Sequence, residues 1–318
     1  MTNRIDRRDA IRLAGAGAAA AILGAQNLRP AGAFPRPEKN AISLACWSLV
    51  RSFRAGYWKQ TDLARLIRND LGLDGIEYVN QFFENPVSTY LNQLNKAAAD
   101  HGVENVLIMV DHEGSMVAKD KKDRMQSAIN HRKWVDVAAY LGCHAIRCNA
   151  HGGGNSMADD PDAVNRAAES FGDLLDYAKP AKINVIIENH GGLSSDPAFL
   201  PALCRKLDNP NFGLLPDYGN YPQGISQADR EDAVRKAMPF AKGVSVKAGW
   251  QPDGTHPAYD LEPLIRISMK AGYRGFWGIE SGMRADAPEG ASPEEIWERD
   301  KQAVLWTKAA IEKAVFGK

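Results

Sequence analysis

The sequence predicts an α/β fold, a single (β/α)8 TIM barrel, and three observations indicate it. Short apolar runs rich in β-branched residues alternate with helical periodicity from residue 41 onward. Eight such units follow one another without interruption, which favours a closed barrel over a doubly wound sheet. Glycine precedes several predicted strands, at Gly72, Gly102, Gly142 and Gly272, where it can end a helix in the left-handed conformation.

Each element is predicted from its own pattern. The strands are short apolar runs at 42–46, 75–79, 103–110, 145–149, 184–188, 213–216, 243–247 and 276–280. The helices show apolar residues at helical spacing at 61–69, 90–100, 124–141, 162–181, 197–207, 227–238, 261–271 and 293–316. An Asp or Ser beside a Pro marks three of the helix starts, at Asp160-Pro161, Asp196-Pro197 and Ser292-Pro293.

Residues 1–33 differ in composition from the rest of the chain. The pair Arg7-Arg8 precedes an apolar run at 13–25, which is followed by the small residues Ala31-Gly32-Ala33. This order is typical of a twin-arginine export signal, so we expect a periplasmic protein whose residues 34–318 form the barrel. An N-terminal membrane anchor is the alternative. The run is rich in glycine and shorter than the roughly 20 residues that span a bilayer, so stable membrane insertion is not expected.

The overall charge excludes one class of partner. The 39 Lys and Arg residues balance 39 Asp and Glu residues, so the chain has no broad basic field for nucleic acid. A small-molecule partner is expected instead, and a homo-oligomer is possible. The four cysteines lack a CxxC spacing and are interpreted as buried small residues, with 143 and 148 the only plausible pair.

Polar residues stand where the predicted strands end, which is where TIM barrels place their chemistry. Glu188, Lys247 and Glu280 end predicted strands five, seven and eight, and Asp217 directly follows strand six. A carboxylate after an apolar run needs a cation, a metal ion or hydrogen bonds to offset its desolvation. Oxygen ligands of this kind suit a hard divalent ion such as Mn²⁺ or Mg²⁺. The alternative is that each acid forms a separate ion pair or caps a helix.

These strand ends also resemble a known group of enzymes. The motifs are 186–190 (IIENH), 215–220 (LPDYGN), 244–247 (VSVK), 272–275 (GYRG) and 278–280 (GIE). In this order they are similar to the xylose-isomerase-like superfamily of sugar isomerases and epimerases, over nearly the whole chain after the signal. In its ketose 3-epimerases a Glu, an Asp, a His and a Glu on strands five to eight bind one divalent metal ion. The resemblance implies that Glu188, Asp217 and Glu280 are metal ligands.

The resemblance departs at strand seven, where this chain has Ser245 and Lys247 in place of a histidine. The fourth ligand therefore stays open. Either water or His190 completes the metal site, or Lys247 supplies the positive charge that the ion would otherwise supply.

The reaction that the resemblance implies is proton abstraction from a carbon next to a carbonyl group, on a free sugar or a keto-glycoside. Glu188 and Glu280 are assigned to remove and return the proton, and Lys247 or the ion to polarise the carbonyl oxygen. Position at strand ends assigns four residues to the sugar hydroxyls: His112, His151, His190 and Asn220. Four aromatic residues are candidates to stack on the sugar, Trp47, Tyr78, Tyr218 and above all Trp250.

Three other functions remain open from the sequence. A lyase or hydratase acting on a 3-keto-glycoside would use the same proton abstraction and then expel a substituent. A non-catalytic periplasmic carbohydrate-binding protein would explain the missing strand-seven histidine. An abasic-site endonuclease on the same kind of barrel would need further histidine ligands for a zinc cluster and a basic groove, and neither is visible in the sequence.

Overall fold

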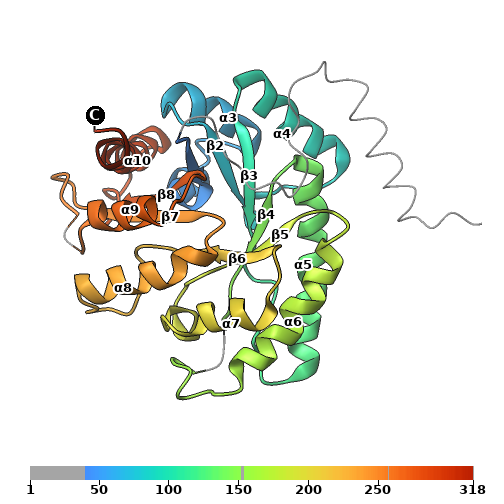
Figure 1. Ribbon diagram of the computed structural model, residues 1–318. Helices are drawn as coiled ribbons and strands as arrows, with labels where there is room; N and C mark the ends of the chain where they lie inside the picture. Colours follow the sequence, from blue (N-terminus) through green and yellow to red (C-terminus); the bar gives the residue numbers. More distant parts are fainter. Residues whose placement is uncertain (1–39, 152–153, 257, 318) are drawn as a thin grey trace, which may run out of the picture. The chain divides into compact units, whose positions relative to one another are not determined.

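The computed structural model describes residues 40–151, 154–256 and 258–317. The predicted export signal lies outside the described residues. Eight parallel strands stand at the centre of the described part and helices lie around them (Figure 1). The strands are β1 (Ile42–Ala45), β2 (Gly75–Val79), β3 (Glu104–Met109), β4 (Ala145–Cys148), β5 (Asn184–Glu188), β6 (Phe212–Leu215), β7 (Val244–Trp250) and β8 (Trp277–Met283).

Helices alternate with these strands along the chain. They are α2 (Val50–Arg54), α3 (Leu63–Arg65), α4 (Ser88–His101), α5 (Lys121–Leu141), α6 (Ala163–Ala178), α7 (Phe199–Leu207), α8 (Gln227–Ala237), α9 (Leu261–Lys270) and α10 (Pro293–Phe316). Their buried faces are apolar, as in α7, where Phe199, Leu200 and Leu203 pack inward. In the described residues, no helix is both long and apolar enough to cross a membrane.

The sheet closes on itself, which confirms the predicted (β/α)8 barrel. Its ladder runs in the order β6-β5-β4-β3-β2-β1-β8-β7, with every pair parallel. Between β6 and β7 two isolated parallel bridges complete the ring, Leu214 with Ala241 and Asp217 with Ser245. The carboxyl ends of all eight strands therefore surround one mouth.

The predicted bounds of the elements agree with the structure to within three residues. Gly102 and Gly142 end α4 and α5 in the left-handed conformation, as expected from the sequence. The first predicted helix, 61–69, is a composite of a 3-10 turn, α3 and a π-helical turn at Leu66–Asp70. All four cysteines are buried thiols.

Strands β7 and β8 extend beyond their predicted ends. Their predicted ends are the charged residues Lys247 and Glu280, at which the apolar runs stop, but the ladder continues to the pair Trp250 and Met283. Lys247 and Glu280 are direct partners in this register. Because side chains of paired residues point to the same face of a sheet, the extension brings this lysine and this glutamate side by side.

One buried acid lies inside the barrel itself. Glu77 on β2 is 2 % exposed and accepts a hydrogen bond from Ser43 Oγ at 2.6 Å. Burial raises its pKa to about 7. Strand β8, which is separated from β2 only by β1, leaves room for this carboxyl at Gly278. A Cβ at this position would lie 2.5 Å from Glu77 Oε1 and 2.8 Å from the carbonyl oxygen of Val244.

We expect Gly278→Ala to lower the free energy of unfolding by roughly 1–3 kcal/mol, the usual cost of overpacking a core. Gly282→Ala on the same strand is the matched control, because a Cβ there meets nothing within 4 Å. Urea unfolding of both variants measures the difference. Equal stability of the two variants would contradict the tight packing of Glu77 against β8.

Candidate active site

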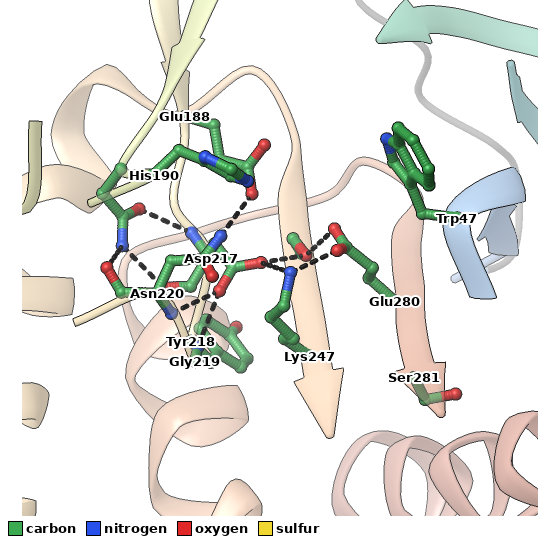
Figure 2. Close-up of polar contacts among 12 residues, drawn as sticks. Trp47, Glu188, His190, Asp217, Tyr218, Gly219, Asn220, Lys247, Glu280 and Ser281 are labelled. Carbon is green, nitrogen blue, oxygen red and sulfur yellow. Dashed lines mark hydrogen bonds and ion pairs between the residues drawn. The ribbon is translucent and has the colours of Figure 1, made fainter. Parts of the chain in front are cut away.

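Three carboxylates from neighbouring strands come together at the mouth of the barrel. One oxygen from each of Glu188, Asp217 and Glu280 lies within 4.8 Å of the others. Glu188 ends β5, Asp217 follows β6 and Glu280 lies on β8. Figure 2 shows that the side chain of Lys247 points between Asp217 and Glu280.

The turn after β6 holds Asp217 in one orientation. Its Oδ1 accepts hydrogen bonds of 2.7 Å from the backbone N–H groups of Gly219 and Asn220, and its Oδ2 accepts one of 2.5 Å from Ser245 Oγ. The side chain of Asn189 bonds both the N–H and the carbonyl oxygen of Asp217, at 2.8 and 2.9 Å. Asp217 is therefore fixed by its own turn and by both neighbouring strands.

Lys247 and Glu280 form an ion pair in the middle of the β7–β8 ladder. The Nζ of Lys247 contacts Glu280 Oε1 and lies 3.9 Å from Asp217 Oδ2. Burial alone would raise the pKa of Glu280, but the charge and hydrogen bond of Lys247 outweigh it, and the pKa is lowered. Glu280 is thus held in its ionised form beside a cation.

Glu188 is the most enclosed of the three acids. Its side chain has no exposed surface. Oε1 accepts a hydrogen bond of 2.7 Å from Asn220 Nδ2, and Oε2 forms an ion pair of 2.9 Å with Arg147 Nε. Burial raises the pKa of Glu188 well above its ordinary value despite Arg147. The environments of Glu188 and Glu280 therefore shift their pKa values in opposite directions, as in many acid–base pairs.

Arg147, the central cation of this network, was not among the residues predicted from the sequence. It lies on β4 with its side chain 1 % exposed, and Nη1 bonds Asp111 Oδ1 at 2.7 Å. Asp111 also accepts hydrogen bonds from Trp47 Nε1 and Asn149 Nδ2. The available signal was an arginine within an otherwise apolar strand, since a buried arginine requires carboxylate partners.

A pocket of about 680 Å³ opens beside Glu280. We call it the acidic pocket, and its lining is Trp47, Gln81, Asp111, His112, Gly114, His151, His190 and Glu280. The rings of His151 and His190 meet edge to face at 5.3 Å. Burial, with the charge of Arg147, lowers the pKa of His190 to about 4, so this imidazole is neutral at pH 7. The three predicted sugar-binding histidines thus share one pocket with Glu280.

Lys247 and Asn220 line a second pocket, of about 620 Å³. We call it the basic pocket, because its charged lining residues are Arg230, Lys247 and Arg284. The Lys247–Glu280 ion pair joins the two pockets, since Glu280 lines the acidic one and Lys247 the basic one.

Trp250 is not brought to either pocket. Its Nε1 donates a hydrogen bond of 2.8 Å to Thr307 on α10, and it lines a third pocket on the helix side of the barrel. Tyr78 and Tyr218 are almost fully buried, and their hydroxyls bond Asn105 and Ser268. Trp47 is the aromatic candidate that faces the acidic pocket.

The three acids suit a hard divalent ion in donor chemistry and in spacing, since Mg²⁺ and Mn²⁺ prefer carboxylate oxygens gathered around one point. Strand β7 offers Ser245 and Lys247 beside them, and Ser245 Oγ already donates to Asp217. An ion at this position and the ammonium group of Lys247 would compete for the same oxygens.

Comparison with known proteins gives the following matches. A family model described as "Xylose isomerase-like TIM barrel" matches residues 67–307. No curated protein matches the sequence. An L-ribulose 3-epimerase structure aligns with a TM-score of 0.65 and 19 % identity, covering 87 % of this chain and 96 % of the other.

Two further solved structures are similar. The 3-keto-D-glucoside 4-epimerase from E. coli has a TM-score of 0.61 and 14 % identity, with coverage of 79 % and 94 %. A xylose isomerase-like TIM barrel protein from Mycobacterium smegmatis, solved in complex with magnesium, has a TM-score of 0.58 and 17 % identity, with coverage of 85 % and 97 %. At these identities the similarity shows a shared fold.

Proposed function

The chain belongs to the xylose isomerase-like TIM barrel family, and we propose that it is a carbohydrate isomerase or epimerase that transfers a proton at a carbon next to a carbonyl group. The observation that supports this most directly is the ionised Glu280 in the acidic pocket, paired with Lys247. The similar structures named as L-ribulose 3-epimerase and 3-keto-D-glucoside 4-epimerase support the same reaction class.

Glu280 is the proposed base. It lines the acidic pocket, and its carboxylate stays charged because Lys247 lies beside it. A hydrogen on a carbon next to a carbonyl group becomes removable when a cation stabilises the charge that develops on the carbonyl oxygen. Return of the proton by Glu280 to the carbonyl carbon on the same face gives isomerisation, provided that the hydroxyl proton of the first carbon passes to the carbonyl oxygen.

Epimerisation needs a second group, because the proton must return to the opposite face of the same carbon. Glu188 is the proposed donor, since its carboxyl lies within 4.8 Å of Glu280 and burial favours its protonated form. Glu188 has no exposed surface. It reaches a sugar only after its hydrogen-bond partner Asn220, which lines the basic pocket, turns away.

The substrate we propose is a free sugar or a keto-glycoside. His112, His151 and His190 offer ring nitrogens to hydroxyl groups in the acidic pocket, and Trp47 offers an aromatic face. His112 is held in the left-handed region, with φ of 62°, in the turn after β3. We do not assign Trp250 to the substrate, because it lines a different pocket.

Two cations can polarise the carbonyl oxygen. Lys247 is the first candidate, because its Nζ contacts Glu280 at the junction of the two pockets. Mg²⁺ or Mn²⁺ is the second, supported by the close approach of Glu188, Asp217 and Glu280. Bound there, such an ion would act as a Lewis acid on the carbonyl oxygen.

The lyase alternative has no such support from the similar structures. A barrel that only binds sugars remains a testable alternative, because it would bind a sugar without exchanging any of its hydrogens. Deuterium exchange separates the three outcomes: exchange with epimer or isomer formation, exchange with loss of a substituent, or no exchange.

We also propose that residues 1–33 export the folded barrel to the periplasm, which supports an unphosphorylated substrate. An Arg7→Lys, Arg8→Lys double variant should then accumulate in the cytoplasm. Cell fractionation measures it, and periplasmic recovery equal to that of the wild type would contradict a twin-arginine signal.

The roles of the two glutamates can be separated in deuterated water, with free ketoses and 3-keto-glycosides as substrates. We expect Glu280→Gln to lose both hydrogen exchange and product formation by about 10²–10⁴-fold, the usual contribution of a general base. We expect Glu188→Gln to keep the exchange and lose epimer formation, because only the return to the opposite face is removed.

NMR of the substrate carbon next to the carbonyl group measures both quantities. Thermal unfolding of each variant controls for loss of structure. Unchanged turnover in Glu280→Gln would refute the proposed base.

The cation is tested by chelation and by Lys247→Met. We expect the wild type to stay active in EDTA and Lys247→Met to lose about 10²–10³-fold in turnover, as when an electrostatic donor to a developing oxyanion is removed. Electron paramagnetic resonance of free Mn²⁺ should show tighter ion binding by Lys247→Met, because a competing positive charge is gone. Loss of wild-type activity in EDTA, restored by Mg²⁺ or Mn²⁺, would instead assign the role to the ion.

A further inference from the structure

All the charged side chains among the described residues that line the basic pocket are positive. Its charged side chains are Arg230, Lys247 and Arg284, and His256 adds an imidazole. Among the described residues that line it, there is no Asp or Glu. The third pocket, on the helix side, is lined by both signs of charge, with the acids Glu231, Asp260 and Glu262 beside basic residues. The absence of acids among the described lining residues is therefore a particular feature of the basic pocket.

Arg230 is a rigid, largely buried cation in this pocket. It is 6 % exposed, and its guanidinium lies over the rings of Tyr259 and Tyr221, at 4.1 and 5.4 Å from their centroids. Nη1 donates to the carbonyl oxygen of Tyr218 at 2.6 Å. In the described part of the chain Arg230 forms no ion pair with a carboxylate, and its buried Nε has no hydrogen-bond partner. A buried arginine left without a carboxylate is uncommon.

Arg284 and His256 also line the basic pocket. Arg284 follows β8, is exposed, and donates through Nε to the carbonyl oxygen of Gly249 at 3.2 Å. Within the described residues it has no carboxylate partner either. The ring of His256 packs edge to face on Tyr259 at 4.6 Å, and its Nε2 is without a partner. The guanidinium groups of Arg284, after β8, and of Arg230, on α8, therefore both line this pocket.

The two pockets meet at the proposed reaction centre. Lys247 and Glu280, which are ion-paired, separate them. The charged groups of the acidic pocket are Asp111 and Glu280, and no Lys or Arg is among its described lining residues. The cleft is thus negative on one side of this pair and positive on the other.

We propose that the basic pocket binds an anionic group of the substrate, so that the substrate is an acidic sugar whose carboxylate or sulfate ester lies against Arg230 and Arg284. This rests on the proposed function in placing the reacting carbon over Lys247 and Glu280. The acidic pocket repels an anion and accepts the uncharged hydroxyl groups, so the charge split orients the sugar. Guanidinium groups suit this role because they bind planar carboxylates and ester oxygens through two parallel hydrogen bonds.

Binding is tested apart from turnover by isothermal titration calorimetry with matched sugar pairs. D-glucuronate and D-galacturonate are compared with D-glucose and D-galactose, and glucose 6-sulfate tests the other anion. We expect one acidic sugar to bind at least about tenfold more tightly than its neutral parent, since hydrogen bonds to charged groups contribute roughly that much. The preference should weaken as salt is added.

Three variants link the preference to the pocket. Arg284→Gln, at an exposed position, should lose most of the preference for the acidic sugar and leave binding of the neutral parent unchanged. Arg230→Gln should do the same if it folds, but the exposed variant suffices. Arg266→Gln is the control, because Arg266 is an exposed arginine of α9 that pairs with Glu262 and does not line the basic pocket.

The outcomes also separate this inference from the proposed reaction. Equal binding of acidic and neutral sugars, or a preference that Arg284→Gln leaves intact, overturns the inference. Arginine-dependent binding of an acidic sugar without any hydrogen exchange would support the pocket and refute the reaction. Hydrogen exchange on neutral sugars alone would support the reaction and refute the pocket.

Discussion

Charge compensation at the mouth of the barrel is the constraint on which the site depends. Four acids gather there, Asp111, Glu188, Asp217 and Glu280, and two cations lie among them, Arg147 and Lys247. Each buried carboxylate would cost several kcal/mol if it were left without a partner. Arg147 compensates the charges of Asp111 and Glu188. Lys247 compensates those of Asp217 and Glu280. Removing either cation would leave two acids facing one another, so the side chains keep their places as a group.

Much of this arrangement was predictable, because its geometry follows from topology. Once eight parallel strands are recognised, residues that end consecutive strands must surround one opening. Glu188, Asp217 and Glu280 could be placed together on that ground alone. The predicted strand ends differ most from the observed ones at β7 and β8. There the ladder continues past Lys247 and Glu280 through small and polar residues that resemble a loop in sequence.

The rest depends on side-chain direction and on partners distant in sequence. Arg147 stands among apolar neighbours on β4, and only its contacts with Asp111 and Glu188 show that it points into the barrel. Trp250 and Trp47 both follow predicted strands. Trp250 packs on α10 and Trp47 faces the acidic pocket, because β7 continues to Trp250 whereas Trp47 lies in the 3-10 turn Cys46–Leu49 after β1. The accessible Glu280 and the enclosed Glu188 are likewise indistinguishable in sequence.

The two pockets come from different halves of the barrel. Apart from Glu280, the acidic pocket is lined from the segments that follow β1 to β5, and the basic pocket from those that follow β6 to β8, with Arg230 of α8. The two pockets adjoin at the rung between Lys247 and Glu280, and the turn after β6 also bonds Glu188 through Asn220. Loops of the basic pocket away from these contacts can therefore vary while the reacting groups stay in place, so relatives of this protein can accept differently substituted sugars with the same chemical step.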